Sequence, residues 1–77
     1  MSPRLPALKS REVVRALERA GFVVSRMSGS HCRLLHDTDP ARKVTVPLHA
    51  GTDMKRGTLH AIIAQAGLTV DGFLKLL

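Results

Sequence analysis

The sequence contains no tryptophan, no tyrosine and only two phenylalanines among its 77 residues. A core without large rings has to be built from aliphatic side chains, so the composition predicts a small core of Val, Leu and Ile in one domain over residues 1–77. Few rings are available to stack on unpaired bases, so any selectivity for a nucleic acid is expected to come from its shape or backbone.

Cysteine and long apolar runs are also scarce. The single cysteine, Cys32, cannot form a disulfide within the chain. No apolar run is long enough for a signal peptide or a membrane span, and no helix combines a basic face with interfacial aromatics. These shortages predict a reduced, cytoplasmic protein that does not bind membranes.

Acidic residues are half as frequent as basic ones. Twelve Lys and Arg stand against six Asp and Glu, which gives a formal net charge of +6. This excess is larger than solubility requires, so it favours an anionic partner. Nucleic acid ranks first because the cations are spread along the whole chain.

Hydrophobic periodicity predicts helices at both ends of the chain. Residues 1–9 contain two prolines and are expected to form an extended arm. Residues 11–20 have helical spacing, with Ser10 as the expected N-cap and Gly21 as the terminating glycine. Two later helices follow, the last one capped by Thr69. Their expected core side chains are Leu59, Ile62, Ile63, Ala66, Val70, Phe73, Leu74 and Leu77.

Between these helices, three strands are predicted at residues 22–26, 31–36 and 42–48. Short connections favour an antiparallel meander. Pro47 cannot donate a ladder hydrogen bond, so the third strand is expected to lie at an edge. The fold class is therefore α+β, with the order αβββαα.

The second strand begins with a histidine, His31, that follows a glycine turn. Alternate residues of a half-buried strand share a face, so Cys32 and Leu34 are expected to point to the core and His31 and Arg33 to solvent. An exposed imidazole beside a guanidinium can carry protons at an anionic substrate. The alternative is that His31 is an ordinary surface residue, which is the commoner role of a strand histidine.

A second group of cations lies where the middle helix begins. Lys55 and Arg56 occupy the end of the helix dipole that disfavours positive charge, and Gly57 adds a further conformational cost. Free N–H groups, a glycine and two cations together form a cradle suited to phosphate. The alternative is that Asp53 caps the helix and the cations point to solvent.

Four histidines raise the question of a metal site, which their spacing does not favour. His31 and His36 have opposite strand parity, while His49 and His60 have no carboxylate or thiolate at ligand spacing. We therefore expect no metal and no cofactor. Cys32 is expected to pack in the core and not to act as a nucleophile.

A series of short motifs runs through the chain in a fixed order, namely Leu5-Pro6, Arg11-Glu12-Val13, Leu17, Ala20-Gly21-Phe22, Gly29-Ser30-His31, Val44-Thr45-Val46-Pro47 with His49, Gly57-Thr58-Leu59 and Ala66-Gly67-Leu68. This ordered set resembles the HicA toxins of bacterial toxin–antitoxin pairs, over about residues 5–77.

The resemblance implies a fold like the double-stranded-RNA-binding domain, in which helices cover one face of a three-stranded antiparallel sheet. It implies a metal-independent endoribonuclease that cleaves mRNA, arrests translation and is inhibited by a cognate HicB-like antitoxin. The family's catalytic histidine falls on His31, and Gly29 and Ser30 form the turn before it. The inhibitor is expected to cover the solvent face of the sheet.

RNA carries its own nucleophile, the 2′-hydroxyl, so a protein that cleaves it has to move protons and stabilise charge on phosphorus. We expect His31 to move a proton, while Arg33, Lys55 and Arg56 hold the phosphate. His49 is a weaker candidate for a second proton carrier or phosphate contact. The alternative functions are a non-catalytic RNA- or DNA-binding module that uses the same basic face and a protein-interaction domain for an acidic partner.

Overall fold

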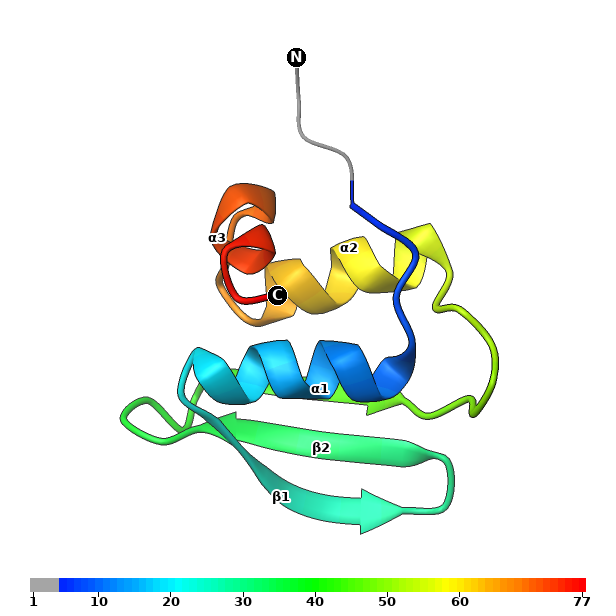
Figure 1. Ribbon diagram of the computed structural model, residues 1–77. Coiled ribbons are helices and arrows are strands. Elements are labelled where there is room, and N and C mark those ends of the chain that lie inside the picture. The colour runs from blue at the N-terminus through cyan, green and yellow to red at the C-terminus, as the bar shows by residue number, and fades with distance from the viewer. Residues whose placement is uncertain (1–4) are drawn as a thin grey trace.

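The computed structural model describes residues 5–77, so the first four residues of the predicted arm lie outside it. A helix is followed by three strands and two more helices (Figure 1), which confirms the predicted order. The elements are α1 Ser10–Arg19, β1 Phe22–Ser28, β2 His31–His36, β3 Lys43–Pro47, α2 Arg56–Gln65 and α3 Val70–Leu74.

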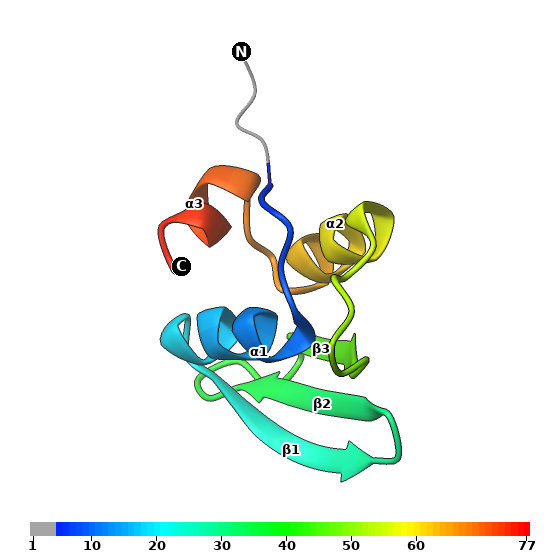
Figure 2. The same ribbon diagram turned by 45° about the vertical axis from the view of Figure 1, so that its right-hand side comes forward.

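The three strands form one antiparallel sheet in the order β1-β2-β3. β3 is an edge strand, as its proline predicts. Figures 1 and 2 both show the three helices on one side of this sheet, and no helix of residues 5–77 covers the other side. The α+β layout is therefore that of a double-stranded-RNA-binding domain, with an inner face toward the helices and an outer face toward solvent.

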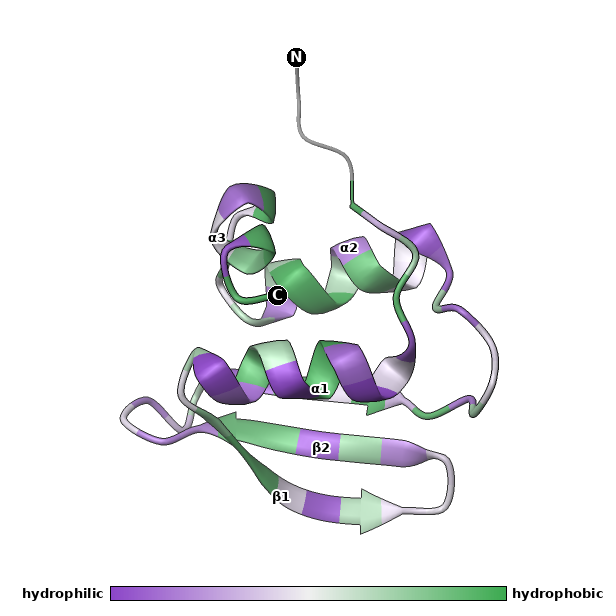
Figure 3. Cartoon of the chain, viewed as in Figure 1, coloured by the Kyte–Doolittle hydropathy of each residue, from purple (hydrophilic) through white to green (hydrophobic). Residues whose placement is uncertain are grey.

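The core lies between the inner face and the helices. The hydrophilic and hydrophobic bands that alternate along the first half of β2 in Figure 3 reflect the two-residue period of a strand. Cys32 and Leu34 are buried and His31 and Arg33 are exposed, so the predicted orientation of β2 is confirmed. The buried apolar residues form one cluster made up of Leu5, Leu8, Val13, Ala16, Leu17, Phe22, Cys32, Leu34, Val44, Val46, Leu59, Ile62, Ile63, Ala66 and Phe73.

The start of α1 differs from the sequence prediction. Lys9 is the N-cap, and its backbone N–H donates to Glu12 Oε1 at 2.9 Å. Ser10 is instead the first helical residue, and it is buried. Its hydroxyl donates to the carbonyl of Pro47 at 2.8 Å and accepts from the N–H of His49 at 3.3 Å. The serine therefore joins α1 to the end of β3, which a capping pattern does not predict.

β1 is two residues longer than predicted and contains a bulge. Val24 pairs with Leu34 and Arg26 pairs with Arg33, so Ser25 has no partner on β2. An extra residue in one strand reverses the facing of the side chains that follow it. Arg26 therefore lies on the outer face beside Arg33, although regular alternation from Val24 would direct it toward α1.

The chain ends show one confirmed and one wrong prediction. Thr69 caps α3, because its hydroxyl accepts the N–H of Gly72 at 3.0 Å. Leu77 was expected in the core but is 47% exposed, since α3 ends at Leu74. At the other end, Leu5 and Leu8 of the predicted arm belong to the core.

Candidate functional site

The outer face of the sheet contains a shallow hollow of about 350 Å³. It is lined by five exposed residues, two on β1, two on β2 and one on β3, which are Arg26, Ser28, His31, Arg33 and Thr45. The strand register arranges them in rows, because Ser28 pairs with His31 and both Arg26 and Thr45 pair with Arg33. The structure thus brings His31 and Arg33 together, as the sequence predicts.

The hairpin before His31 fixes where β2 begins. Ser28 pairs with His31, so only Gly29 and Ser30 lie in the turn. Gly29 has a φ of 56°, a conformation that glycine adopts at little cost and that two-residue hairpins require. The carbonyl of Ser30 accepts the N–H of Leu48 at 2.6 Å. Ser30 therefore secures the hairpin to the chain after β3 through its backbone.

The outer hollow is lined by basic side chains without an acidic neighbour among them. None of its lining residues is acidic, and neither of the two ion pairs found within residues 5–77 involves Arg26 or Arg33. Like charges directly opposite each other on neighbouring strands are destabilising. An arginine pair kept in this arrangement is suited to an anionic ligand, which would separate and satisfy both guanidinium groups.

His49 and Lys55 line a second hollow of about 440 Å³, which does not include His31. The two hollows are neighbours, since Pro47 lines this one and pairs with His31. Arg56 lines neither hollow. The predicted phosphate-binding residues are therefore divided between the outer face of the sheet and its β3 edge.

The start of α2 is not capped by Asp53, which was the alternative to a phosphate cradle. Lys55 is the N-cap and makes no side-chain capping bond, and the first turn has no acidic residue. Asp53 instead pairs with Lys9, with 3.0 Å between Oδ1 and Nζ. A Cβ atom added at Gly57 would meet nothing within 4 Å, so the space beside this residue is open and does not itself require a glycine.

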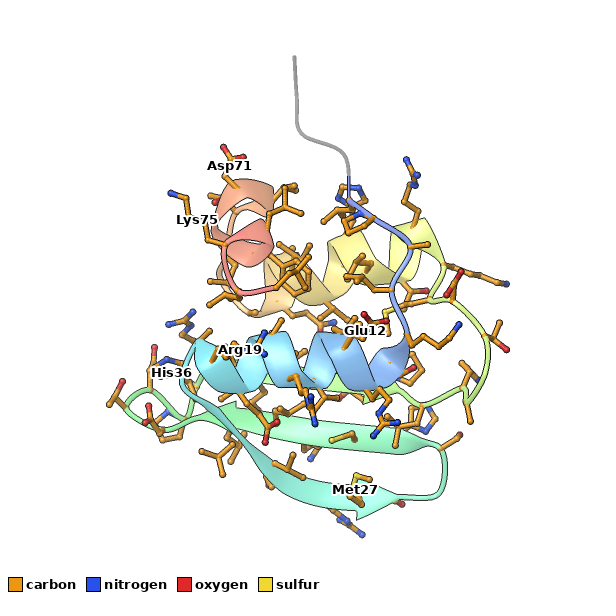
Figure 4. All side chains as sticks on the ribbon, viewed as in Figure 1. Glu12, Arg19, Met27, His36, Asp71 and Lys75 are labelled. Atoms are coloured by element: carbon orange, nitrogen blue, oxygen red, sulfur yellow. The ribbon has the colours of Figure 1, made fainter. Side chains whose placement is uncertain are left out.

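Other reactive side chains have structural roles. His36 lies at the end of β2 farthest from His31 (Figure 4). The centroid of its ring lies 5.1 Å from that of Phe22, with the two rings in an edge-to-face arrangement. Its Nε2 lies 3.1 Å from the carbonyl oxygen of Ala20. Burial, with a smaller contribution from the charge of Glu18, raises the pKa of the Cys32 thiol. The thiol therefore stays protonated, which fits a packing residue.

Residues 5–77 contain neither a metal site nor a membrane-spanning helix. No three His, Cys, Asp or Glu side chains lie close enough together to hold a metal ion. No helix in this part of the chain has the length and apolar character needed to cross a membrane.

Three lining residues of the outer hollow were missed by sequence reasoning. Ser28 and Thr45 are small polar residues with no distinctive spacing. Arg26 is the important omission, because regular strand alternation assigns it to the inner face and the bulge at Ser25 moves it to the outer one. A bulge depends on pairing with another strand, so no local signal in the sequence announces it.

Comparison with curated proteins gives no match. Comparison with protein families matches residues 10–68 to the HicA toxin of bacterial toxin–antitoxin systems. This match extends over more than half of the chain and includes α1, the whole sheet and α2. The chain therefore belongs to the HicA toxin family.

Proposed function

We propose that this toxin is an endoribonuclease that cleaves mRNA without a metal ion and uses His31 to move the proton. The observation that carries the proposal is the outer hollow, where an exposed imidazole at the start of β2 lies among arginines and no acid. The net charge of +6 adds a long-range attraction for RNA.

The chemistry requires little from the protein. The 2′-hydroxyl of the substrate attacks the neighbouring phosphorus, the bond to the departing 5′-oxygen breaks, and a 2′,3′-cyclic phosphate and a 5′-hydroxyl remain. One proton has to leave the 2′-hydroxyl and one has to reach the 5′-oxygen. His31 performs one of these transfers, and water completes the other. Arg33, which is the next outward-facing residue of β2 after His31, stabilises the negative charge that builds on phosphorus.

The second hollow extends the binding surface for a polymer. RNA that crosses the His31 end of the sheet reaches the neighbouring hollow past Pro47, where His49 and Lys55 contact the next part of the backbone. Arg56 adds charge at the start of α2. Since His49 does not share the hollow of His31, we assign it a phosphate contact and not the second proton transfer.

As a member of this family, the chain is the toxin of a toxin–antitoxin pair and has a cognate antitoxin. We propose that this antitoxin is HicB-like and acts in the cytoplasm by covering the outer face of the sheet. A structure of the complex in which His31 remains open to solvent would contradict this docking.

The decisive experiment compares the purified wild type with His31→Ala on RNA in excess chelator. Removal of a general acid or base is expected to slow cleavage by about 10² to 10⁴-fold. An RNA with a single 2′-deoxy nucleotide at the cut position should resist the wild type. The pH dependence of the rate then assigns the role of His31, because a histidine base becomes more effective as pH rises and a histidine acid less effective.

His60→Ala is the matched control, because His60 is an exposed histidine on α2 that lines neither hollow. It should cleave as the wild type does. Cleavage at the wild-type rate by a folded His31→Ala variant would refute the assignment of His31. Tight RNA binding without cleavage by the wild type would favour the non-catalytic binding module instead.

A further inference from the structure

We propose that Arg26 and Arg33 form a two-arginine clamp for an RNA phosphate, next to His31 on the outer face of the sheet. The clamp rests on the proposed ribonuclease function and identifies a binding residue, Arg26, that neither the sequence motifs nor regular strand alternation assign. Its basis is the combination of a bulge, a cross-strand pair of like charges and a shared hollow.

The bulge is what brings Arg26 to the clamp. Ser25 is the extra residue of β1, and beyond it Arg26, Met27 and Ser28 follow the pairing of β2. Arg26 and Ser28 consequently share the outer face with their partners, while Met27 faces the side of its partner Cys32. Bulges commonly redirect a side chain next to an active site, and here the redirected side chain is a guanidinium.

Other arginines of the fold show what a structural role looks like. Arg19 donates to the carbonyl of Leu76 at 2.6 Å, and Arg42 donates from Nε to the carbonyl of Ala66 at 3.1 Å. Within residues 5–77, the side chains of Arg26 and Arg33 make no such hydrogen bond and join no ion pair. The donors of both remain available to a ligand.

The spacing suits a single phosphate group. Neighbouring strands lie about 4.8 Å apart, so two guanidinium groups that face the same way from paired positions can both reach one anion. Each arginine presents a fork of N–H donors that matches phosphate oxygens. His31 lies two residues from Arg33 on the same face, roughly 6.7 Å along the strand, which places the imidazole beside a phosphodiester held by the clamp.

The test measures binding of an RNA whose 2′-hydroxyls are methylated, so that it cannot be cleaved through them. Arg26→Gln is expected to weaken binding about tenfold. It should also reduce the slope of log affinity against log salt by about 0.7, the value for one phosphate contact on a single strand.

Two further variants separate the clamp from general charge. The double variant Arg26→Met with Met27→Arg keeps composition and net charge but moves the guanidinium to the other side of the sheet, and it should bind as weakly as Arg26→Gln. Met27 is 63% exposed on β1 near the hairpin (Figure 4), so the position accepts a polar side chain. Arg15→Gln, an exposed change on α1, should weaken binding less than twofold.

Each outcome decides between the two proposals. Equal loss in Arg26→Gln and Arg15→Gln, or no loss in Arg26→Gln, would overturn the clamp. Cleavage by the wild type together with unchanged binding by Arg26→Gln would keep the ribonuclease and remove the clamp. Arg26-dependent binding without cleavage would keep the clamp and remove the ribonuclease. A wild type that neither binds nor cleaves RNA would overturn both, and circular dichroism of each variant excludes unfolding as the cause.

Discussion

The inner and outer faces of the sheet are built from the same three strands but differ in burial and in charge. On β2, Cys32 and Leu34 of the inner face are buried, whereas His31 and Arg33 of the outer face are exposed. The inner face packs against helices and has the only buried thiol, and the outer face carries an arginine pair in an open hollow. Strand alternation thus places core side chains and the side chains of the candidate site at neighbouring positions of one strand.

The largest expected effect on stability comes from the inner face. Leu34→Ala removes a side chain with 0% exposure and should lower the free energy of unfolding by about 2–5 kcal/mol, through lost burial and the cavity left behind. Domains of this length have only about 4–12 kcal/mol in total, so the loss is a large fraction of the stability. Urea unfolding measures the change, and the volume-conserving Leu34→Met should cost less than about 1.5 kcal/mol. A loss below 1 kcal/mol for Leu34→Ala would contradict the division between the faces.

An intermediate effect on stability is expected at Ser10, which lies between the core and the second hollow. Ser10→Ala removes the hydroxyl that joins the carbonyl of Pro47 to the N–H of His49, and should cost about 1–3 kcal/mol because both groups lose a partner near the core. Thermal unfolding measures it, with the exposed Thr52→Ala in the same hollow as a control that should change little. If both substitutions cost the same, the bridge has no special role.

The smallest effect on stability is expected from the outer face. Arg33→Gln should change the free energy of unfolding by less than about 0.5 kcal/mol, since the side chain is exposed. At low salt the substitution should raise the free energy of unfolding slightly, because it removes the repulsion between Arg33 and Arg26. This gain should disappear at high salt. RNA cleavage should nevertheless fall at least about tenfold. Strong destabilisation by Arg33→Gln would show that the outer face also supports the fold.

The order of the strands and the facing of β2 could be predicted because they depend on local patterns. The alternation from His31 to Leu34, the glycine turn before it and the proline at the end of β3 each indicate structure through sterics that act within a few residues. The stripe of Leu59, Ile62 and Ile63 likewise predicted the buried face of α2. The same patterns placed His31 and Arg33 together, which is the part of the candidate site that lies on one strand.

The remainder of the candidate site required contacts between distant segments. The sequence around Ser10 is typical of an N-cap, yet its hydroxyl donates to the carbonyl of Pro47 at the end of β3, 37 residues away. The charge of Lys55 predicts a place beside His31, but the loop after β3 takes this lysine to a separate hollow. Such contacts are decided by packing between elements, which no local propensity encodes.

The sequence by itself determined the order of the elements, the inner face of β2 and the exposure of one histidine beside one arginine. These features follow from the periodic spacing of apolar residues along the chain and from the burial of their side chains. Only the tertiary structure decided which cations share the face of His31. A one-residue bulge in β1 reverses the facing of Arg26, and a bulge exists only in the pairing of two strands.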